Sequence, residues 1–322
     1  MRLGINFGDF HEGDLQFAKQ LGVTDMLAHR PAAEGDGYYD FIGLLRLRTR
    51  IEAAGLRFAG IGNLRRDWLE KAIYGLPGAD EQIANFCQTV RNAGKAGVPV
   101  IVYTFPAISL QRIYRTHLQD RGRGGALVTS HDQRLLDDAP LLGPKPLSKE
   151  EVWANFSRFL TQVVPVAEEV GVKLAIHPDD PPLPPVGGIA SLLESPDDFR
   201  RVIELAPSEH NGICFCQGCF TEMVGEGVYD EIRYFGERKR IFAVHFRNLK
   251  GQMPRFAECF IDDGDIDMLR AMRIYKDVGY DGVMVPDHVP HLVGIGPDKY
   301  ATWAFPLGYM RALMTVVEAE PR

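Results

Sequence analysis

The chain has 322 residues, of which 45% are hydrophobic, so it can bury the core of one large α/β barrel or of two medium domains. Its 36 basic and 43 acidic residues give a formal net charge of −7. This balance argues against a general nucleic-acid binder or a protein of anionic membranes, because both usually need a basic face. No apolar run approaches the roughly 20 residues that span a bilayer, and no signal peptide stands near Met1. Five cysteines in a chain of this size disfavour a disulfide framework, so we expect a cytoplasmic protein.

The first half of the chain alternates short apolar runs with amphipathic stretches, which predicts strand–helix units. The expected strands are 2–7, 23–28, 56–61 and 100–105, and the expected helices are 14–22, 41–54 and 80–96. The run 100–105 is continuous and β-branched, as suits a parallel strand covered on both faces. A long connection rich in Arg, Gly and Asp follows at about 106–147. Connections of that length are usually functional lids or mobile segments.

The second half repeats this rhythm more regularly. Its expected strands are 173–176, 213–216, 241–246 and 283–285, and its expected helices are 148–171, 229–240, 266–278, 299–318 and one that begins near 195. Eight strands that are each followed by a helix, without a break in composition, predict a single (β/α)8 barrel domain over 1–322. The segment 106–147 is then an excursion between the fourth strand and its helix. A doubly wound open sheet is the alternative, and the absence of a G-x-G-x-x-G after an early strand weakens it.

A polar residue of a metal-binding type closes each of the last four strands. These residues are His177, Cys216, His245 and Asp287. They are spaced by about one βα unit, so they would stand on adjacent strands at the carboxyl-terminal rim, where barrels carry their active sites. Alone, each has an ordinary explanation as a core histidine, a small buried thiol or a helix cap. Together, an imidazole pair, a thiolate and a carboxylate favour a shared site for a divalent transition metal.

A second arrangement of ligands uses Cys214, Cys216 and Cys219 as a structural zinc cluster. The C-x-C-x2-C spacing has no second C-x2-C or H-x3-H partner, which disfavours this interpretation. Residues two apart in a strand share a face, so Cys214 could instead lie deeper in the barrel, beneath Cys216.

Three further positions near these strand ends suit catalysis. Strand alternation would place Arg247 toward the metal as a clamp for a carboxylate, and a surface ion pair is the alternative. His288 directly follows one of the candidate ligands and could act as a general acid or base. Asp179 and Asp180 either orient the neighbouring histidine or cap a turn.

Several ordered motifs resemble those of the mannonate dehydratase family. They are NAGKAGVPVIVYTF, VVPVAEEVGVKLAIHPDDPP, NGICFCQG, VHFRN, GDIDM and GYDGVMVPDH, in this order along the chain. The resemblance covers most of the sequence from about Ala84 onward and is weak before that point. It implies a xylose-isomerase-like barrel that takes part in hexuronate degradation. It also implies elimination of water from D-mannonate to give 2-keto-3-deoxy-D-gluconate, with Mn2+ or Fe2+ as cofactor.

The resemblance also implies roles for particular residues. The family's metal ligands fall on His177, Cys216, His245 and Asp287 of this chain. Its catalytic histidine falls on His288, and a downstream catalytic tyrosine matches Tyr300; with Arg247 these are the expected catalytic residues. We further expect a homodimer that binds a small sugar acid and neither nucleic acid nor membrane.

The chain departs from the family pattern where a substrate should be contacted. Leu183 and two prolines follow HPDDPP, where the family commonly has an aromatic residue. The family's C-[TV]-G-[ST] turn reads Cys216-Gln217-Gly218-Cys219 here, and 106–147 lacks much of the family's segment. A shortened, divergent member with an altered substrate is therefore expected. A metal-dependent sugar isomerase or epimerase on the same barrel, and a non-catalytic sugar-acid-binding protein, are the alternatives.

Overall fold

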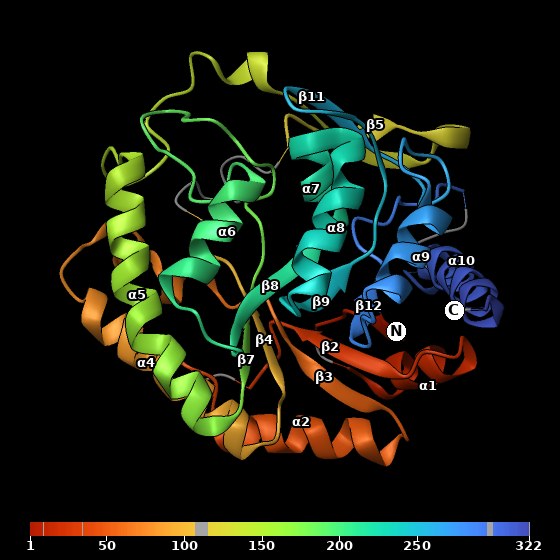
Figure 1. Ribbon diagram of the computed structural model, residues 1–322, viewed down its shortest axis with the longest axis horizontal. Coiled ribbons are helices and arrows are strands. Elements are labelled where there is room, and N and C mark those ends of the chain that lie inside the picture. The colour runs from red at the N-terminus through yellow and green to blue at the C-terminus, as the bar shows by residue number, and fades with distance from the viewer. Residues whose placement is uncertain (9, 34, 107–114, 295–298, 322) are drawn as a thin grey trace.

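Eight parallel strands close a barrel in the computed structural model, which describes the chain except residues 9, 34, 107–114, 295–298 and 322 (Figure 1). The strands are β1 (Arg2–Ile5), β2 (Asp25–His29), β3 (Arg57–Gly62), β4 (Val100–Tyr103), β7 (Lys173–Ile176), β8 (Asn211–Cys216), β9 (Ile241–His245) and β12 (Val283–Val285). Their order around the barrel is β1-β12-β9-β8-β7-β4-β3-β2. The predicted (β/α)8 barrel is thus confirmed, and the open sheet is wrong.

Helices surround this barrel and cover the outer faces of its strands (Figure 1). They are α1 (Glu12–Gln20), α2 (Phe41–Ala53), α3 (Glu70–Tyr74), α4 (Ala79–Lys95), α5 (Lys149–Val170), α6 (Pro196–Leu205), α7 (Gln217–Val224), α8 (Val228–Glu237), α9 (Met268–Asp277) and α10 (Lys299–Ala319). Short 3-10 turns occupy Arg66–Trp68, Arg123–Gly125, Gln133–Leu136 and Gly225–Gly227. A capping box begins α5, because Ser148 and Glu151 exchange side-chain and backbone hydrogen bonds of 2.9 and 3.2 Å. Among the helices that the structure describes, none is long and apolar enough to cross a membrane.

A small cluster of strand side chains forms a separate inner core of the barrel. It includes Leu27, Val102, Ala175, Cys214 and Val285. Cys214 is fully buried there, two residues before Cys216, as strand alternation predicts. The inner core thus supports the carboxyl ends of the strands from below.

A second sheet of four antiparallel strands lies beyond the carboxyl ends of the barrel, at the top of Figure 1. Its order is β10 (Leu249–Gln252), β11 (Arg255–Glu258), β6 (Leu127–Asp132) and β5 (His117–Arg121). Strands β5 and β6 come from the predicted excursion 106–147, of which 107–114 lie outside the described residues. Strands β10 and β11 form a hairpin directly after β9. The sheet therefore ties the excursion to the strand-end region that carries the candidate site.

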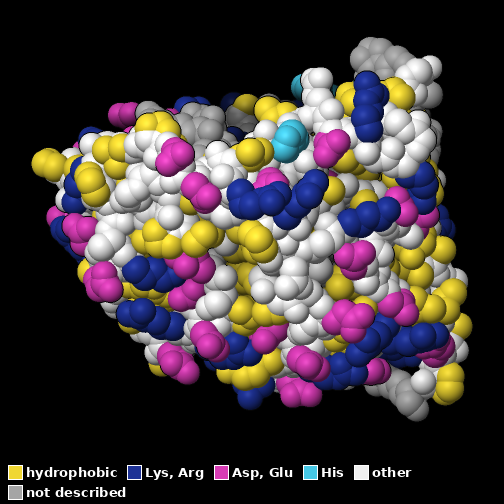
Figure 2. All heavy atoms as spheres, turned by 90° about the horizontal axis from the view of Figure 1, so that it is seen from above, with side chains coloured by type: hydrophobic (Ala, Val, Ile, Leu, Met, Phe, Trp, Pro, Cys, Tyr) yellow, Lys and Arg dark blue, Asp and Glu magenta, His cyan; other side chains and the backbone are white. Residues whose placement is uncertain are grey.

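The surface on this side of the molecule carries charges of both signs. Figure 2 shows Lys and Arg side chains interspersed with Asp and Glu over its described residues. One exposed pair joins the excursion to the segment after β11, since Arg123 donates to Asp262 over 2.9 Å. Such exposed pairs contribute little to stability, about 0–1 kcal/mol each.

Candidate functional site

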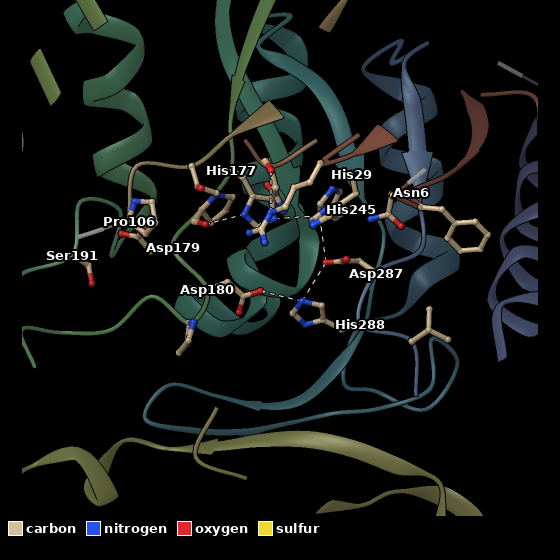
Figure 3. Close-up of a pocket in the computed structure, with 18 of the residues that line it drawn as sticks. Asn6, His29, Pro106, His177, Asp179, Asp180, Ser191, His245, Asp287 and His288 are labelled. Carbon is tan, nitrogen blue, oxygen red and sulfur yellow. Dashed lines mark hydrogen bonds and ion pairs between the residues drawn. The ribbon is translucent and has the colours of Figure 1, made fainter. Parts of the chain in front are cut away.

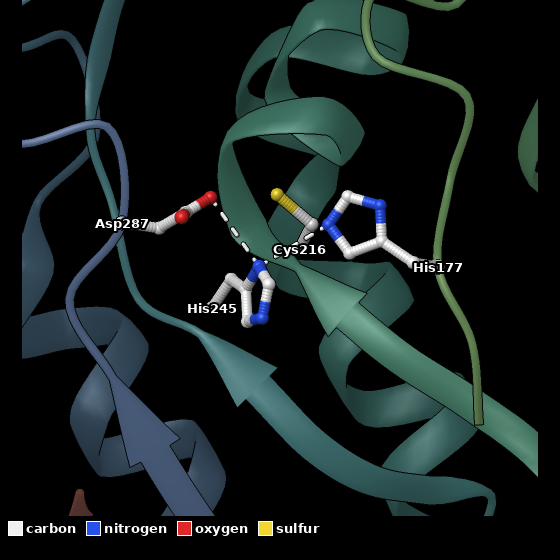
Figure 4. A group of neighbouring side chains, drawn as sticks. All are labelled: His177, Cys216, His245 and Asp287. Atoms are coloured by element: carbon white, nitrogen blue, oxygen red, sulfur yellow. Dashed lines mark hydrogen bonds and ion pairs between the residues drawn. The ribbon is translucent and has the colours of Figure 1, made fainter. Parts of the chain in front are cut away.

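The carboxyl ends of four adjacent barrel strands bring the predicted metal ligands together (Figure 4). His177 follows β7, Cys216 closes β8, His245 closes β9 and Asp287 follows β12. One ligand atom from each lies within 4.8 Å of those of the other three. His245 Nδ1 is central, 3.2 Å from His177 Nε2 and 3.3 Å from an Asp287 oxygen. The expected placement on adjacent strands is therefore observed, while a ligand role for these residues stays a prediction.

The turn after β7 fixes the orientation of His177. Its Nδ1 lies 2.8 Å from the carbonyl oxygen of Pro178. Because a carbonyl only accepts, Nδ1 carries the hydrogen, and the lone pair of Nε2 faces the other three side chains. Metal-binding histidines are commonly oriented in this way, by a hydrogen bond from the ring nitrogen that does not bind the metal.

Neighbouring charges and hydrogen bonds favour the ionised forms of the cysteine and the aspartate in this cluster. Burial raises the pKa of the Cys216 thiol, but a hydrogen bond with Cys219 and the charge of Arg247 bring it well below its usual value. Burial likewise raises the pKa of Asp287, but His288 and the neighbouring imidazole hold it below its usual range. A thiolate, a carboxylate and two imidazoles in a buried cluster are a donor set that fits a divalent transition metal.

A cavity of about 610 Å³ opens over this cluster (Figure 3). Three of the predicted ligands, His177, His245 and Asp287, form part of its wall. The opposite wall comes from the ends of β1, β2 and β3, and it includes Asn6, Phe7, His29, Arg30 and Asn63. A cavity of this size is in the range that holds small-molecule ligands.

Arg247 lies in a buried network of carboxylates. Its Nη1 donates to both oxygens of Glu258 over 2.7 and 2.9 Å, and its Nη2 donates to Glu222 over 2.9 Å and to Asp180 over 3.2 Å. The backbone of Gly218 packs so closely on the guanidinium that a Cβ there would clash. The alternative of a surface ion pair is wrong, because Arg247 is 2% exposed. The clamp is not supported either, since its donors bind protein carboxylates and Arg247 is not among the residues that line the cavity.

Arg115 joins the same network from the excursion. Its Nη2 lies 2.7 Å from an oxygen of Asp180 and 2.7 Å from an oxygen of Glu258, and its guanidinium packs 4.8 Å from the ring of Phe256. Sequence reasoning missed Arg115, Glu222 and Glu258. For Glu258, a local pattern was present in β11, which reads RFAE: Phe256 and Glu258 are two residues apart in this strand, and both are buried.

The carboxylates of this network differ in charge. Burial raises the pKa of Asp180, but Arg115 and Arg247 hold it below its usual range. Burial and the charge of Asp180 raise the pKa of Glu222 to about 8, against the opposite effect of the two arginines. Glu222 is therefore largely protonated at neutral pH, whereas Asp180 is ionised.

His288 connects the network to the cavity. Its Nδ1 lies 2.8 Å from a Glu258 oxygen, and its Nε2 lies 3.4 Å from Asp180 and 3.6 Å from Asp287 (Figure 3). Burial and Arg247 lower the pKa of His288, but the carboxylates of Asp287, Glu258 and Asp180 raise it to about 9. The imidazole therefore lines the cavity in its charged form at neutral pH.

Tyr300 lies away from these residues, near the start of α10. Its hydroxyl donates to Asp14 on α1 over 3.0 Å, and its ring packs 4.6 Å from that of Phe17. Tyr300 is not among the residues that line the cavity. Its catalytic role stays a prediction that these contacts do not support.

Asp179 anchors the loop that follows HPDDPP. One of its oxygens accepts from the backbone N–H groups of Leu192 and Leu193 over 3.0 and 3.1 Å. Burial raises the pKa of Asp179 to about 7, although these two hydrogen bonds lower it. Of the two roles expected for the acidic pair, Asp179 takes the structural one, and Asp180 takes part in the charge network.

The comparisons with known proteins agree on one family. The family described as D-mannonate dehydratase (UxuA) matches residues 5–143 and 141–318. Mannonate dehydratase of Thermotoga maritima is 30% identical over 302 residues, covering 83% of this chain and 81% of the relative. The crystal structure of mannonate dehydratase from Streptococcus suis serotype 2 superposes with a TM-score of 0.86 at 26% identity, over 98% of this chain and 93% of that one.

The wider fold is shared with more distant barrels. A xylose isomerase domain protein from Planctomyces limnophilus superposes with a TM-score of 0.64 at 13% identity, over 98% of both chains, which indicates the same fold alone. The predicted xylose-isomerase-like barrel is confirmed. With the family match extending over nearly all of its length, this chain belongs to the mannonate dehydratase family.

Proposed function

We propose that this chain is a hydro-lyase that removes water from a sugar acid of the aldonate class. The first candidate reaction is D-mannonate to 2-keto-3-deoxy-D-gluconate. The observation that carries the proposal is the meeting of two histidines, a cysteine and an aspartate at one cavity, in a chain of the mannonate dehydratase family. A family match by itself leaves the chemistry open, because function depends on the site rather than on the fold.

The proposed cofactor is Mn2+ or Fe2+, held by His177, Cys216, His245 and Asp287. Such an ion supplies Lewis-acid polarisation of the substrate carboxylate, which makes the neighbouring C2–H more acidic. The mixed nitrogen, sulfur and oxygen donor set suits a transition metal better than Mg2+ or Ca2+. Sugar isomerases and epimerases of this fold generally use several carboxylate ligands, so this set favours the dehydratase.

His288 is the proposed group that protonates the departing C3 hydroxyl. Its Nδ1 is held by Glu258 at 2.8 Å, which leaves Nε2 as the atom that can transfer a proton on the cavity side. A proton donor fixed in this way typically contributes a factor of about 10²–10⁴ to the rate. Removal of the C2 proton needs a second group, and Tyr300 remains the prediction for it from the family resemblance.

Arg30 takes over the substrate-binding role that was expected of Arg247. Arg30 follows β2 and is the one arginine or lysine among the described residues that line the cavity. Its Nε donates to the backbone oxygen of Asn63 over 3.2 Å, which directs the guanidinium along the cavity wall. The remaining N–H groups can bind a carboxylate or hydroxyl groups of a sugar acid.

Leu183 is the position where we propose that substrate preference departs from the family. It is 2% exposed and lines the cavity directly after HPDDPP. A leucine in place of an aromatic ring leaves more room and removes a planar surface for the sugar. Related aldonic acids, and not D-mannonate alone, should therefore be tested.

The test is an assay of the purified, metal-loaded protein for 2-keto acids, with a panel of aldonic acids as substrates. The proposal predicts keto-acid formation from at least one of them and none with the Cys216→Ala variant, whose metal content is measured in parallel. Sugar epimers or isomers in place of keto acids would establish the isomerase alternative. Binding of an aldonate without turnover would establish the binding-protein alternative.

The proposed assembly rests on the family resemblance, and the proposed location rests on the cysteine content, which disfavours a disulfide framework. We propose a homodimer, which light scattering of the purified protein tests directly. We also propose a cytoplasmic location, which fractionation of cells that express the full chain tests. A monomer, or a protein in the membrane or exported fraction, would overturn these two proposals without touching the catalytic one.

A further inference from the structure

Two cysteines stand one helical turn apart at the start of α7. Cys216 is the last residue of β8 and the N-cap of α7, and Cys219 lies in the first turn of that helix. Both side chains are fully buried, and a hydrogen bond links the two thiols. Disulfides join residues whose Cα atoms are about 4.4–6.8 Å apart, a separation that residues i and i+3 of a first helical turn meet.

The surroundings hold this pair in place. Arg247 Nη2 donates to the sulfur of Cys219 over 3.3 Å, and Gly218 between the cysteines packs against the same guanidinium. Cys216 lies beside His177 and His245, which line the cavity. Cys216 is itself fully buried and is not among the residues that line the cavity, so a small molecule in the cavity has to pass these two imidazoles to reach its sulfur.

We propose that Cys216 and Cys219 form a reversible disulfide when the metal-free protein meets a hydroperoxide. The oxidation of the two thiols is independent of the reaction catalysed. Its consequence, loss of a metal ligand, rests on the ligand role of Cys216 in the proposed function. The pair then makes metal binding, and with it catalysis, dependent on redox conditions.

The chemistry balances with one hydroperoxide for each disulfide. The Cys216 sulfur attacks one peroxide oxygen, the O–O bond breaks, and the leaving oxygen departs as an alcohol, or as water from hydrogen peroxide, with the thiol proton. This step leaves a sulfenic acid on Cys216. The Cys219 sulfur then attacks the Cys216 sulfur, so that the S–S bond forms, the S–O bond breaks, and water leaves with the second thiol proton. Two thiols are oxidised and one peroxide is reduced.

Metal and disulfide compete for the same sulfur. A cysteine that binds a metal does so as a thiolate and is no longer available for attack, so bound metal should protect the pair. A disulfide conversely removes the Cys216 thiolate from the donor set. The opposing interpretation is that Cys219 is a buried polar residue that merely accepts a hydrogen bond from Arg247, a task that serine performs as well.

The experiment treats the metal-free protein with hydrogen peroxide, blocks the remaining thiols under denaturing conditions and counts them by intact mass. The wild type should lose two of its five thiols and regain them with dithiothreitol. Cys214→Ala, the matched control on the same strand, should still lose two. Cys219→Ser should lose at most one thiol, as the sulfenic acid of Cys216, and should form no disulfide. Wild type loaded with Mn2+ beforehand should be oxidised more slowly.

Metal binding gives the second readout, with Co2+ as a spectroscopic probe. Peroxide-treated wild type should fail to bind Co2+ until it is reduced, and untreated Cys219→Ser should bind Co2+ as the wild type does. Five intact thiols after treatment, or an equal reversible loss of two in Cys219→Ser, would overturn the disulfide. Inactivity of the reduced, metal-loaded protein toward every aldonate would instead overturn the proposed function and leave the disulfide standing.

Discussion

Replacing Arg247 by methionine should destabilise the protein at neutral pH by about 3–5 kcal/mol, the usual cost of removing one partner from a buried ionic network. Arg247 donates to Glu258, Asp180 and Glu222, whose side chains are 2%, 7% and 0% exposed. Methionine fills a similar volume and offers no donor. The cost therefore comes from carboxylates that lose their counter-charge and not from a cavity.

The magnitude follows from the charges that remain. Arg115 still contacts Asp180 and Glu258 at 2.7 Å, so the variant lacks one positive charge and not the whole network. Glu222 adds little to the deficit at neutral pH, because its pKa of about 8 keeps it largely protonated. One uncompensated buried carboxylate then has to be ionised at a high cost or take up a proton, and each unit of pKa shift corresponds to about 1.4 kcal/mol.

The cost should decrease as the pH falls. In the wild type, Arg115 and Arg247 hold the pKa of Asp180 below its usual range against the effect of burial. Without Arg247, the pKa of the buried carboxylates rises, so the folded variant binds more protons than the unfolded chain in the range above about pH 4. The stability of the variant relative to the wild type should therefore fall as the pH is raised from about 5 to 8.

Glu222→Gln is the matched control in the same network. It should cost under about 1 kcal/mol at pH 7, because it replaces a group that is already largely uncharged. A carboxyl whose folded pKa is raised binds extra protons between its unfolded pKa of about 4.3 and about 8, so the wild type loses stability across this window as the pH rises. The glutamine variant lacks this loss and should gain on the wild type toward pH 8.

Urea unfolding followed by the fluorescence of the three tryptophans measures both variants at several pH values. Equal costs for Arg247→Met and Glu222→Gln at pH 7 would refute the reasoning. So would a cost of Arg247→Met that does not change between pH 5 and pH 8, because the penalty would then not be one of buried charge.

Three further predictions test other parts of the molecule. His288→Asn should lower kcat by about 10²–10⁴-fold and leave the metal content unchanged; a variant with wild-type kcat would exclude His288 as the proton donor. Arg30→Ala should raise KM for the aldonate by roughly tenfold or more, as loss of a charged hydrogen bond does, with a smaller effect on kcat; an unchanged KM would exclude substrate contact. Replacing Asp25 by Asn should lower the free energy of unfolding at pH 7 by about 2 kcal/mol. The Asp25 side chain is 1% exposed and accepts from Arg2 over 2.9 Å and from Arg57 over 2.8 Å. Burial raises the pKa of Asp25, but its hydrogen bonds lower it on balance, so this stability is present above about pH 4 and is lost as the pH falls further; the unfolding free energies of both proteins should converge in acid.

The barrel could be predicted because each of its strands carries a local signal. The strands 173–176 and 283–285 have the predicted bounds, since each is a short apolar run that ends at a polar residue or a proline. The four-stranded sheet has no such signal. Every residue of β5, which reads HLQDR, is exposed, and β6 pairs with β11 from a distant part of the chain. Polar strands that are specified by long-range pairing cannot be recognised from local periodicity.

The candidate site, too, could be predicted from the sequence only in part. The meeting of the four candidate ligands follows from strand order and from the rule that barrel strands point their carboxyl ends to one rim. The partners of Arg247 do not follow from it, because Glu258 comes from the second sheet and Glu222 from α7. Alternation placed Arg247 near the site but could not show that protein carboxylates would take up its donors.

The charge network and the cavity wall formed by the ends of β1, β2 and β3 are built from different elements, and this separates the proposed chemistry from substrate specificity. Strand β11 of the second sheet supplies Glu258, which holds both Arg247 and His288, and Arg115 from the excursion contacts Glu258 in turn. The second sheet and the excursion thus support the proposed proton donor without contributing a candidate metal ligand. The far wall of the cavity comes from Arg30 and its neighbours on β1–β3 and from Leu183 in the loop after β7. Substitutions there can change which sugar acid fits while the ligands, the network and the donor keep their contacts. A chain that departs from its family at Leu183 but keeps the four candidate ligands is therefore expected to retain the elimination and to alter its substrate.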